Sequence, residues 1–298
     1  MSPRINTPRA FLLLGLAVSL MAPLQAADLV VPEDVIFEKN LEYANPDNQH
    51  LQLNLARPRK VSGPLPVVLC IHGGGFRAGS REGYNQLCLK LAQRGFIAAT
   101  ASYRLAPKYQ FPAAVHDTKA AVRWLRANAA RWQADPQRIG VTGGSAGGHL
   151  AQFLGVTAGV AEFEGTDNPG VSSAVSCVVN VYGPSDFTKS YGKSVDAHEV
   201  LPLWLGGNLE TARARHIRSS PLNWVTPAAA PTLIIHGTED KYVHYEQALW
   251  MRDRLSASGV EVNLLTLEGA GHGFKGADAE KADQTLIQYF EQKLSAGK

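Results

Sequence analysis

The chain has 298 residues, of which 45% are hydrophobic and 18% are charged. This composition is typical of a globular protein with a sizeable core and excludes the polar, highly charged class of disordered chains. The formal net charge is only +3, and no run of like charges occurs. The sequence therefore gives no indication of nucleic acid or an anionic membrane surface as a partner.

The first 26 residues have the order of a secretory signal peptide. Two arginines form a basic region, Phe11 to Leu20 is a short apolar run, and small residues precede a cleavage point after Ala26. We expect residues 1–26 to be removed and the mature protein to be periplasmic or extracellular. An uncleaved anchor is the alternative, but the apolar run is shorter than the ~20 residues of a spanning helix. We expect no stable membrane insertion.

The mature chain opens with two strand-like segments between Val35 and Arg57. They are separated by Asn45, Pro46, Asp47 and Asn48, a cluster of residues that favour turns. This pattern predicts an antiparallel hairpin at the start of a sheet.

Apolar runs then alternate with segments of helical spacing. Pro66–Ile71 is a short, continuous apolar run, which is typical of a strand covered on both faces. The alternation predicts an α/β fold with a mostly parallel eight-stranded sheet and helices on both faces. Further strands are predicted over Phe96–Tyr103, Arg138–Thr142, Val175–Val181, Pro231–His236 and Val260–Leu267. Helices are predicted over Tyr84–Arg94, Ala113–Arg131, Ala146–Val156, Tyr245–Ser256 and Ala282–Leu294.

The alternation is interrupted between Gly183 and Ala230, a stretch rich in Pro, Gly, Ser and Trp. We interpret this stretch as a small insertion after the sixth strand that lies over one end of the sheet. Residues 185–228 would form a partial cap. No linker or repeat divides the rest, so residues 27–298 are expected to form a single domain.

Three cysteines occur, Cys70, Cys88 and Cys177. An odd number in an exported protein leaves at least one unpaired. Each lies in an apolar strand-like or helical run, which favours buried free thiols. No spacing of cysteines and histidines indicates a metal site.

The strongest motif is the segment Gly143–Gly147, which fits the pattern G-x-S-x-G. It follows a predicted strand and precedes a predicted helix, as the sharp turn that exposes a nucleophilic serine requires. The dipole of the following helix favours negative charge at its N-terminus. The motif predicts Ser145 as a nucleophile; the alternative is a glycine turn without function.

A second glycine-rich motif, His72–Phe76, directly follows the first buried strand. Glycines let the backbone approach a ligand closely, and rigid N–H groups aimed at an oxyanion lower the barrier to acyl transfer. Gly74 and Gly75 are the predicted donors, with the N–H of Ala146 as the third. A loop without function is the alternative.

A nucleophilic serine needs a histidine base. His272 lies in a glycine-rich loop directly after the last predicted strand, at the sheet edge where sites of open α/β sheets gather. His236 precedes the candidate acids, and His149 lies one helical turn after Ser145, where it is expected to be structural. The context favours His272. No matching context surrounds His116, His198, His216 or His244.

The base in turn needs an acid, and in this fold the acid precedes the histidine in the chain. Glu239 and Asp240 follow a predicted strand side by side. One should face the histidine and the other the solvent, and their chemistry alone does not choose between them. Asp186 opens the insertion and is interpreted as structural or as lining the pocket.

Taken together, these segments resemble the hormone-sensitive-lipase-like esterases of the α/β-hydrolase superfamily. More closely they resemble the bacterial acetyl-esterase and feruloyl-esterase branch of that superfamily. The matching segments run in family order from Val67 to Phe274. They are IHGGGFRAGS, SYRLAPKYQFPAAVHD, GGSAGGHLA, NVYGPSDF, LIIHGTEDKYV and GAGHGF.

The resemblance implies an α/β-hydrolase fold in which Ser145, Asp240 and His272 form a catalytic triad. It implies an oxyanion hole formed by the N–H groups of Gly74, Gly75 and Ala146. It also implies that Arg104 and Asp117 form a structural ion pair.

The sequence departs from the family pattern in three places. Gly144 stands where many lipase-like relatives have Asp, which favours the feruloyl- and acetyl-esterase branch. His244 stands where relatives often have Pro. The segment before the first strand is short, so the helical cap of the lipase-like enzymes is expected to be absent and the cleft to be open.

The expected function is that of a secreted serine carboxylesterase. Its substrates would be short-acyl or aryl esters, including acetyl or feruloyl groups of polysaccharide, or a polyester. No metal or organic cofactor is expected. The alternatives are an amidase or peptidase of the same fold, or an inactive binding protein, although such proteins typically lose a triad member.

Overall fold

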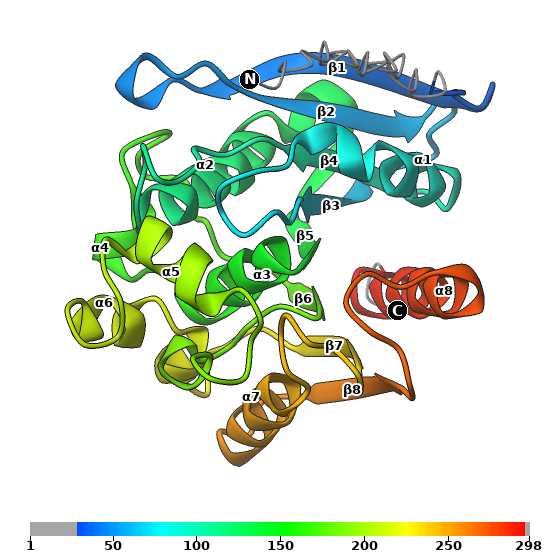
Figure 1. Ribbon diagram of the computed structural model, residues 1–298. Coiled ribbons are helices and arrows are strands. Elements are labelled where there is room, and N and C mark those ends of the chain that lie inside the picture. The colour runs from blue at the N-terminus through cyan, green and yellow to red at the C-terminus, as the bar shows by residue number, and fades with distance from the viewer. Residues whose placement is uncertain (1–28, 296–298) are drawn as a thin grey trace, which may run out of the picture. The chain divides into compact units, whose positions relative to one another are not determined.

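Eight strands form one sheet in the order β1-β2-β4-β3-β5-β6-β7-β8 (Figure 1). β1 pairs with β2, and β2 with β4, in antiparallel orientation, while all other neighbours are parallel. The predicted hairpin and the mostly parallel eight-stranded sheet are both confirmed. The strands are β1 (Val35–Ala44), β2 (Leu51–Pro58), β3 (Leu65–Ile71), β4 (Ile97–Ala101), β5 (Ala134–Gly144), β6 (Cys177–Val181), β7 (Thr232–Gly237) and β8 (Val262–Leu267).

This computed structural model describes residues 29–295, so the predicted signal peptide lies outside the described residues. The sheet and its helices belong to the compact unit that begins at Val31. Within residues 29–295, no helix is long and apolar enough to span a bilayer.

Helices cover both faces of the sheet (Figure 1), as predicted. α1 (Asn85–Gln93) and α8 (Gly276–Lys293) lie on one face, and α2 (Ala113–Ala127), α3 (Ala146–Val156) and α7 (Glu246–Ala257) lie on the other. The shorter helices are α4 (Ala161–Glu164), α5 (Ala197–Leu205) and α6 (Arg213–Arg218). Single 3₁₀ turns occur at η1 (Pro46–Asn48), η2 (Arg81–Tyr84), η3 (Ala129–Trp132), η4 (Phe187–Lys189) and η5 (Pro221–Trp224).

Two helix boundaries differ from the prediction by more than one residue. α2 ends at Ala127 rather than Arg131, because Asn128 leaves helical geometry and a 3₁₀ turn follows. α8 begins at Gly276, six residues before the predicted start. Ala282 is the first buried residue of this helix, so its first turns carry no apolar pattern that could mark them.

The insertion follows β6, as predicted, and consists of short helices rather than a layer of its own. α5 packs onto the loop after β3, where Trp204 stacks on Phe76 with ring centroids 3.7 Å apart. Both aromatic side chains are almost completely buried. Apolar packing therefore joins the insertion to the main core.

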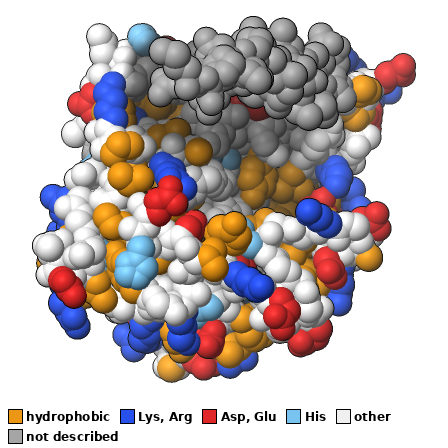
Figure 2. Space-filling model, viewed as in Figure 1, with side chains coloured by type: hydrophobic (Ala, Val, Ile, Leu, Met, Phe, Trp, Pro, Cys, Tyr) orange, Lys and Arg blue, Asp and Glu red, His pale blue; other side chains and the backbone are white. Residues whose placement is uncertain are grey.

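All three cysteines are buried and free, as predicted. Burial raises the pKa of the Cys177 thiol to about 12. On the surface, Lys and Arg alternate with Asp and Glu across the face seen in Figure 2, as expected for a small net charge.

Candidate active site

Ser145 occupies a strained turn between β5 and α3. Its backbone angles are φ +57° and ψ −122°, a region that residues other than glycine rarely adopt. The turn is held by a hydrogen bond from the Ser145 N–H to the carbonyl of Val181, at 3.0 Å. The sharp strand-to-helix turn that the sequence predicts is present.

The glycines around Ser145 are required by close backbone contacts. A Cβ atom on Gly147 would lie 2.0 Å from the carbonyl oxygen of Ile71, and one on Gly143 would lie 2.4 Å from the Gly147 carbonyl carbon. Atoms cannot approach this closely, so any larger residue would push the turn away from the end of β3. Gly144 stands where many lipase-like relatives have Asp. A Cβ on Gly144 would lie 2.9 Å from the hydroxyl of Tyr84, so a side chain at this position requires Tyr84 to move.

The loop after β3 brings backbone donors to the same place. Gly74 has φ +112° and Gly75 has φ +59°, and a Cβ on Gly74 would lie 2.2 Å from the carbonyl oxygen of Ala78. Ala146 is the first residue of α3, where an N–H group has no partner within the helix. Within residues 29–295, the N–H groups of Gly74, Gly75 and Ala146 donate to no acceptor, and all three residues line one pocket.

Asp240 and His272 come from the turns that follow β7 and β8. Oδ2 of Asp240 accepts a hydrogen bond from Nδ1 of His272 at 2.7 Å. Oδ1 accepts the N–H groups of Tyr242 and Val243, each at 2.9 Å. Glu239 is exposed, so the two adjacent acids divide as the sequence suggested, with Asp240 facing the histidine.

The environment of Asp240 keeps its carboxylate ionised. Burial by itself raises the pKa of this group, but hydrogen bonds from His236, His272 and the Val243 amide outweigh burial and hold the pKa well below its ordinary value. An ionised Asp240 fixes the tautomer of His272 with the proton on Nδ1, because a carboxylate can only accept. Nε2 of His272 is then free to accept a proton.

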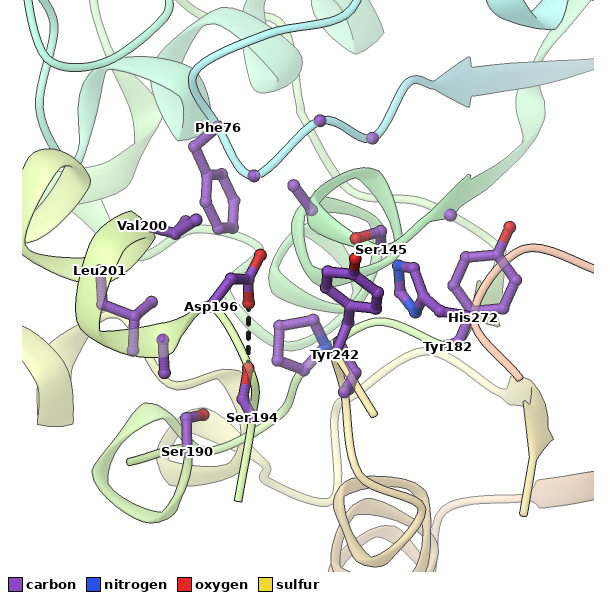
Figure 3. A pocket seen from close by; sticks show the side chains of 18 of the residues that line it. Phe76, Ser145, Tyr182, Ser190, Ser194, Asp196, Val200, Leu201, Tyr242 and His272 are labelled. Atoms are coloured by element: carbon purple, nitrogen blue, oxygen red, sulfur yellow. Dashed lines mark hydrogen bonds between the residues drawn. The ribbon is translucent and has the colours of Figure 1, made fainter. Parts of the chain in front are cut away.

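Ser145 and His272 both line the pocket, which has a volume of about 530 Å³ (Figure 3). Within residues 29–295, the Ser145 hydroxyl makes no hydrogen bond. Hydrogen bonds between nucleophile and base are often long in enzymes without substrate. The fold thus places all six predicted site residues at one edge of the sheet, with Asp240 behind His272.

Two tyrosines flank the imidazole of His272. The ring centroid of Tyr182 lies 4.6 Å away and that of Tyr242 lies 5.3 Å away. Tyr182 follows β6, and Tyr242 belongs to the turn that holds Asp240. The two rings limit how far the imidazole can turn from the pocket.

The rest of the pocket has two chemically different walls, and the insertion supplies most of both. The sequence predicts an open cleft that residues 185–228 partly cover. In the structure, these residues line one side of the pocket. The apolar wall consists of Phe76, Phe187, Val200 and Leu201. The polar wall consists of Ser190, Ser194 and Asp196.

The sequence interpretation missed a role for His236. Its Nε2 lies 2.7 Å from the carbonyl oxygen of Val243 and 3.5 Å from Oδ2 of Asp240. The proton must therefore reside on Nε2, and His236 supports the acid rather than acting as the base. Its position at the end of β7, four residues before Asp240, is the signal that could have indicated this contact.

His244, which has no sequence context that matches a catalytic base, lies outside the predicted triad. It lines the pocket and its Nδ1 lies 2.9 Å from a Glu246 carboxylate oxygen. The segment after Asp240 turns back toward the insertion, and no local pattern reveals that. Asp186 caps η4 by accepting the N–H of Thr188, which matches a structural role.

Other structural predictions are confirmed. His149 is buried, and its Nδ1 lies 3.1 Å from the carbonyl oxygen of Pro184. Burial lowers the pKa of His149 to about 3, so it is neutral. Arg104 and Asp117 form the expected ion pair, with Nη2 and Oδ1 2.7 Å apart.

Comparisons with known proteins place this architecture in a family. The model of the BD-FAE family matches residues 53–255. The chain is 36% identical to Esterase LipC of Mycobacterium tuberculosis over 231 residues, which cover 74% of this chain and 56% of that protein. It is 30% identical to the ethyl acetate hydrolase of Pseudomonas putida, over 85% of this chain and 80% of that protein. The chain spans about half the length of the first two curated relatives it matches, LipC and the probable carboxylic ester hydrolase LipM.

Solved structures agree. A truncated carbohydrate esterase from gut microbiota matches with a TM-score of 0.80 and 25% identity, over 89% of this chain and 99% of that chain. The butyrate-bound esterase Est2 of Thermogutta terrifontis matches with a TM-score of 0.74 and 27% identity, over 88% and 96% of the two chains. The chain therefore belongs to the BD-FAE family, a family of esterases with the α/β-hydrolase fold.

Proposed function

We propose that this protein hydrolyses carboxylic esters by acyl transfer from Ser145 to water. The observation that carries the proposal is the 2.7 Å hydrogen bond between Asp240 and His272. His272 lines one pocket with Ser145 and with three residues whose backbone N–H groups have no acceptor within residues 29–295. The names of the relatives support it, since they are esterases and an ethyl acetate hydrolase.

In the first half-reaction, His272 Nε2 takes the proton of the Ser145 hydroxyl as the oxygen attacks the ester carbonyl. The carbonyl carbon becomes tetrahedral, and the carbonyl oxygen becomes an oxyanion. This oxyanion accepts hydrogen bonds from the N–H groups of Gly74, Gly75 and Ala146. His272 then gives its proton to the departing alkoxide. An acyl-enzyme on Ser145 and a free alcohol result.

In the second half-reaction, His272 deprotonates a water molecule that attacks the acyl-enzyme. The same N–H groups hold the second oxyanion, and the proton returns to the Ser145 oxygen as the acid leaves. Asp240 remains ionised and stabilises the positive charge that His272 carries in each transition state. Every step uses groups of this chain.

The pocket favours a short acyl group. Phe76, Val200 and Leu201 form an apolar wall of the pocket that Ser145 also lines (Figure 3), which suits a small apolar acyl chain. We further propose that the alcohol half is an aryl group or a polysaccharide, with acetyl or feruloyl groups as the acids. The carbohydrate esterase among the structural neighbours supports this.

We also propose that the protein acts outside the cytoplasm, as the first 26 residues suggest. N-terminal sequencing of protein recovered from the periplasm or the medium would test this, with a chain that begins after Ala26 as the expected result. A full-length N-terminus on the recovered protein would overturn the cleavage, and recovery from the cytoplasm alone would overturn export.

The test of the function is hydrolysis by the Ser145→Ala variant, on p-nitrophenyl esters from acetyl to palmitoyl, on methyl ferulate and on a p-nitroanilide. We expect wild-type activity to be highest on the acetyl or butyryl ester. The variant should lose at least about 10⁴-fold in kcat, because no other group replaces the nucleophile. An unchanged melting temperature would show that the variant is folded.

Three outcomes would contradict the proposal. Near wild-type turnover in the Ser145→Ala variant would remove Ser145 as nucleophile. A preference for the anilide would indicate an amidase, and no turnover of any ester would indicate a binding protein.

A further inference from the structure

One carboxylate in the pocket has no role in the mechanism above. Asp196 lines the pocket from the insertion, and its side chain projects toward the middle of the pocket (Figure 3). Its only side-chain partner within residues 29–295 is the Ser194 hydroxyl, which donates to Oδ1 at 3.0 Å. Oδ2 accepts nothing from the described chain.

The ordinary role of an aspartate at this position is not used. Asp196 is the N-cap residue of α5, where an aspartate side chain usually accepts an N–H of the first helical turn. Here the side chain makes no such hydrogen bond. The carboxylate is turned into the pocket instead, although the following residues, Ala197, Val200 and Leu201, are buried and apolar.

Asp196 lies near Tyr242, whose ring flanks His272. The N–H of Val195 donates to the carbonyl of Lys241 at 3.0 Å, so the segments that carry Asp196 and Tyr242 are held together. The Tyr242 ring in turn lies 5.3 Å from that of His272, the residue that hands a proton to the leaving alcohol. Tyr242 lies between His272 and Asp196 in the view of Figure 3.

The available groups suit a ligand with several hydroxyls. Asp196 already accepts from one neutral hydroxyl, and the Ser190 and Ser194 hydroxyls lie in the same wall. Tyr242 is 49% exposed, and an exposed aromatic ring offers a face for the C–H groups of a sugar ring. Arg77 also lines the pocket, but its guanidinium pairs with the Glu199 carboxylate.

We propose that Asp196 and Ser194, with the Tyr242 ring, form a subsite for the sugar half of an ester, in which Asp196 accepts hydrogen bonds from hydroxyl groups. This subsite rests on the proposed ester hydrolysis and specifies its alcohol. A carboxylate accepts stronger hydrogen bonds than a neutral acceptor, so Asp196 contributes most of the discrimination.

The test compares three substrates that share one acyl group. They are a monoacetylated methyl glycoside, p-nitrophenyl acetate and acetylcholine. Because the acyl half is constant, a change in the ratio of their kcat/KM values reports only on the alcohol half. The variants are Asp196→Ala and the isosteric Asp196→Asn. Glu210→Gln is the matched control, because it removes the same charge from an exposed position of the insertion outside the pocket.

We expect the kcat/KM ratio of the glycoside ester to p-nitrophenyl acetate to fall at least about tenfold in Asp196→Ala. Asp196→Asn should give a smaller fall, because the amide can still accept a hydrogen bond. Glu210→Gln should leave the ratio at the wild-type value. Melting temperatures show whether each variant is folded, and the isosteric Asn variant tests the subsite if the Ala variant is not.

Several outcomes would overturn the subsite. A ratio unchanged in both Asp196 variants removes the role of the carboxylate. If the Asp196 variants lose more kcat/KM on acetylcholine than on the glycoside ester, the site binds cations instead. A wild-type protein that cleaves p-nitrophenyl acetate but not the glycoside ester refutes the subsite alone. A wild-type protein that cleaves none of the three refutes the proposed function as well.

Discussion

The pocket is built by two regions that are held in place in different ways. The strand ends that carry Ser145, Asp240 and His272 are fixed by short backbone contacts and hydrogen bonds at 2.7–3.0 Å. In the insertion, residues 185–228, hydrogen bonds to Gln247 hold the first residues. The apolar wall of the insertion lies on α5, which is fixed mainly by packing, as Trp204 stacks on Phe76. Hydrogen-bond geometry tolerates little displacement, whereas apolar side chains of similar volume can replace one another. Changes at the strand ends should therefore affect the chemistry, and changes in the insertion should affect which ester fits.

The largest effect is expected at the acid. Asp240→Asn keeps the shape but can donate to His272, so the imidazole takes the wrong tautomer and kcat should fall about 10⁴-fold. KM should change little, because Asp240 does not line the pocket. Steady-state kinetics on p-nitrophenyl acetate would measure both, and a loss confined to KM would contradict the assignment.

The same variant should change stability in acid. The pKa of Asp240 is lower in the folded state than its unfolded value of about 3.9. Its stabilising contribution is thus present above that value and is lost as the pH falls through the folded-state pKa. Urea unfolding below about pH 4 should show a weaker pH dependence in Asp240→Asn than in the wild type. Equal slopes would mean that Asp240 has an ordinary pKa.

The oxyanion loop should be the next most sensitive place. In Gly74→Ala the new Cβ would lie 2.2 Å from the Ala78 carbonyl oxygen, at a φ of +112° that disfavours alanine. The loop must shift and misplace its N–H groups, which should reduce kcat about 10²-fold and lower the melting temperature. Gly63→Ala is a control for backbone strain away from the site, because its added Cβ meets no atom within 4 Å. Wild-type kcat in Gly74→Ala would exclude this loop as the oxyanion hole.

A smaller effect is expected on the apolar wall. Val200 is 6% exposed and lines the pocket. Val200→Ala removes two methyl groups from the apolar wall and so enlarges the pocket. The ratio of kcat/KM for hexanoyl over acetyl p-nitrophenyl esters should rise up to about tenfold, since one methylene is worth 1–3 kcal/mol in such a pocket. An unchanged ratio would place the acyl group elsewhere.

The smallest effect concerns stability alone. His149 has a folded pKa of about 3 and an unfolded value of about 6.5. Because the folded value is lower, protonation favours unfolding, and stability falls by about 1.4 kcal/mol per pH unit between those values as the pH decreases. His149→Phe removes this loss of stability, and it removes a buried Nε2 that has no partner within residues 29–295. Urea unfolding at pH 7 and pH 5 would measure it, and parallel losses in both proteins would contradict it.

Sequence by itself determined most of the fold and the candidate site. Apolar runs such as Pro66–Ile71 predict strands because burial on both faces leaves no polar positions. Ser145 and the glycines of its turn were evident because a strained turn and close backbone contacts allow few residue types. The histidine could be chosen by its position after the last strand. Between Glu239 and Asp240, the chain alone gave no choice, and the family resemblance supplied it.

Only the tertiary structure decided contacts between segments distant in the chain. His236 supports Asp240 because the turn after β7 folds back onto the strand end. His244 and Asp196 reach the pocket because the insertion and that turn are joined by the bond from Val195 to Lys241. Local patterns report whether a residue is buried or exposed within its own element. They do not report which distant segment it meets, because that depends on how the elements pack.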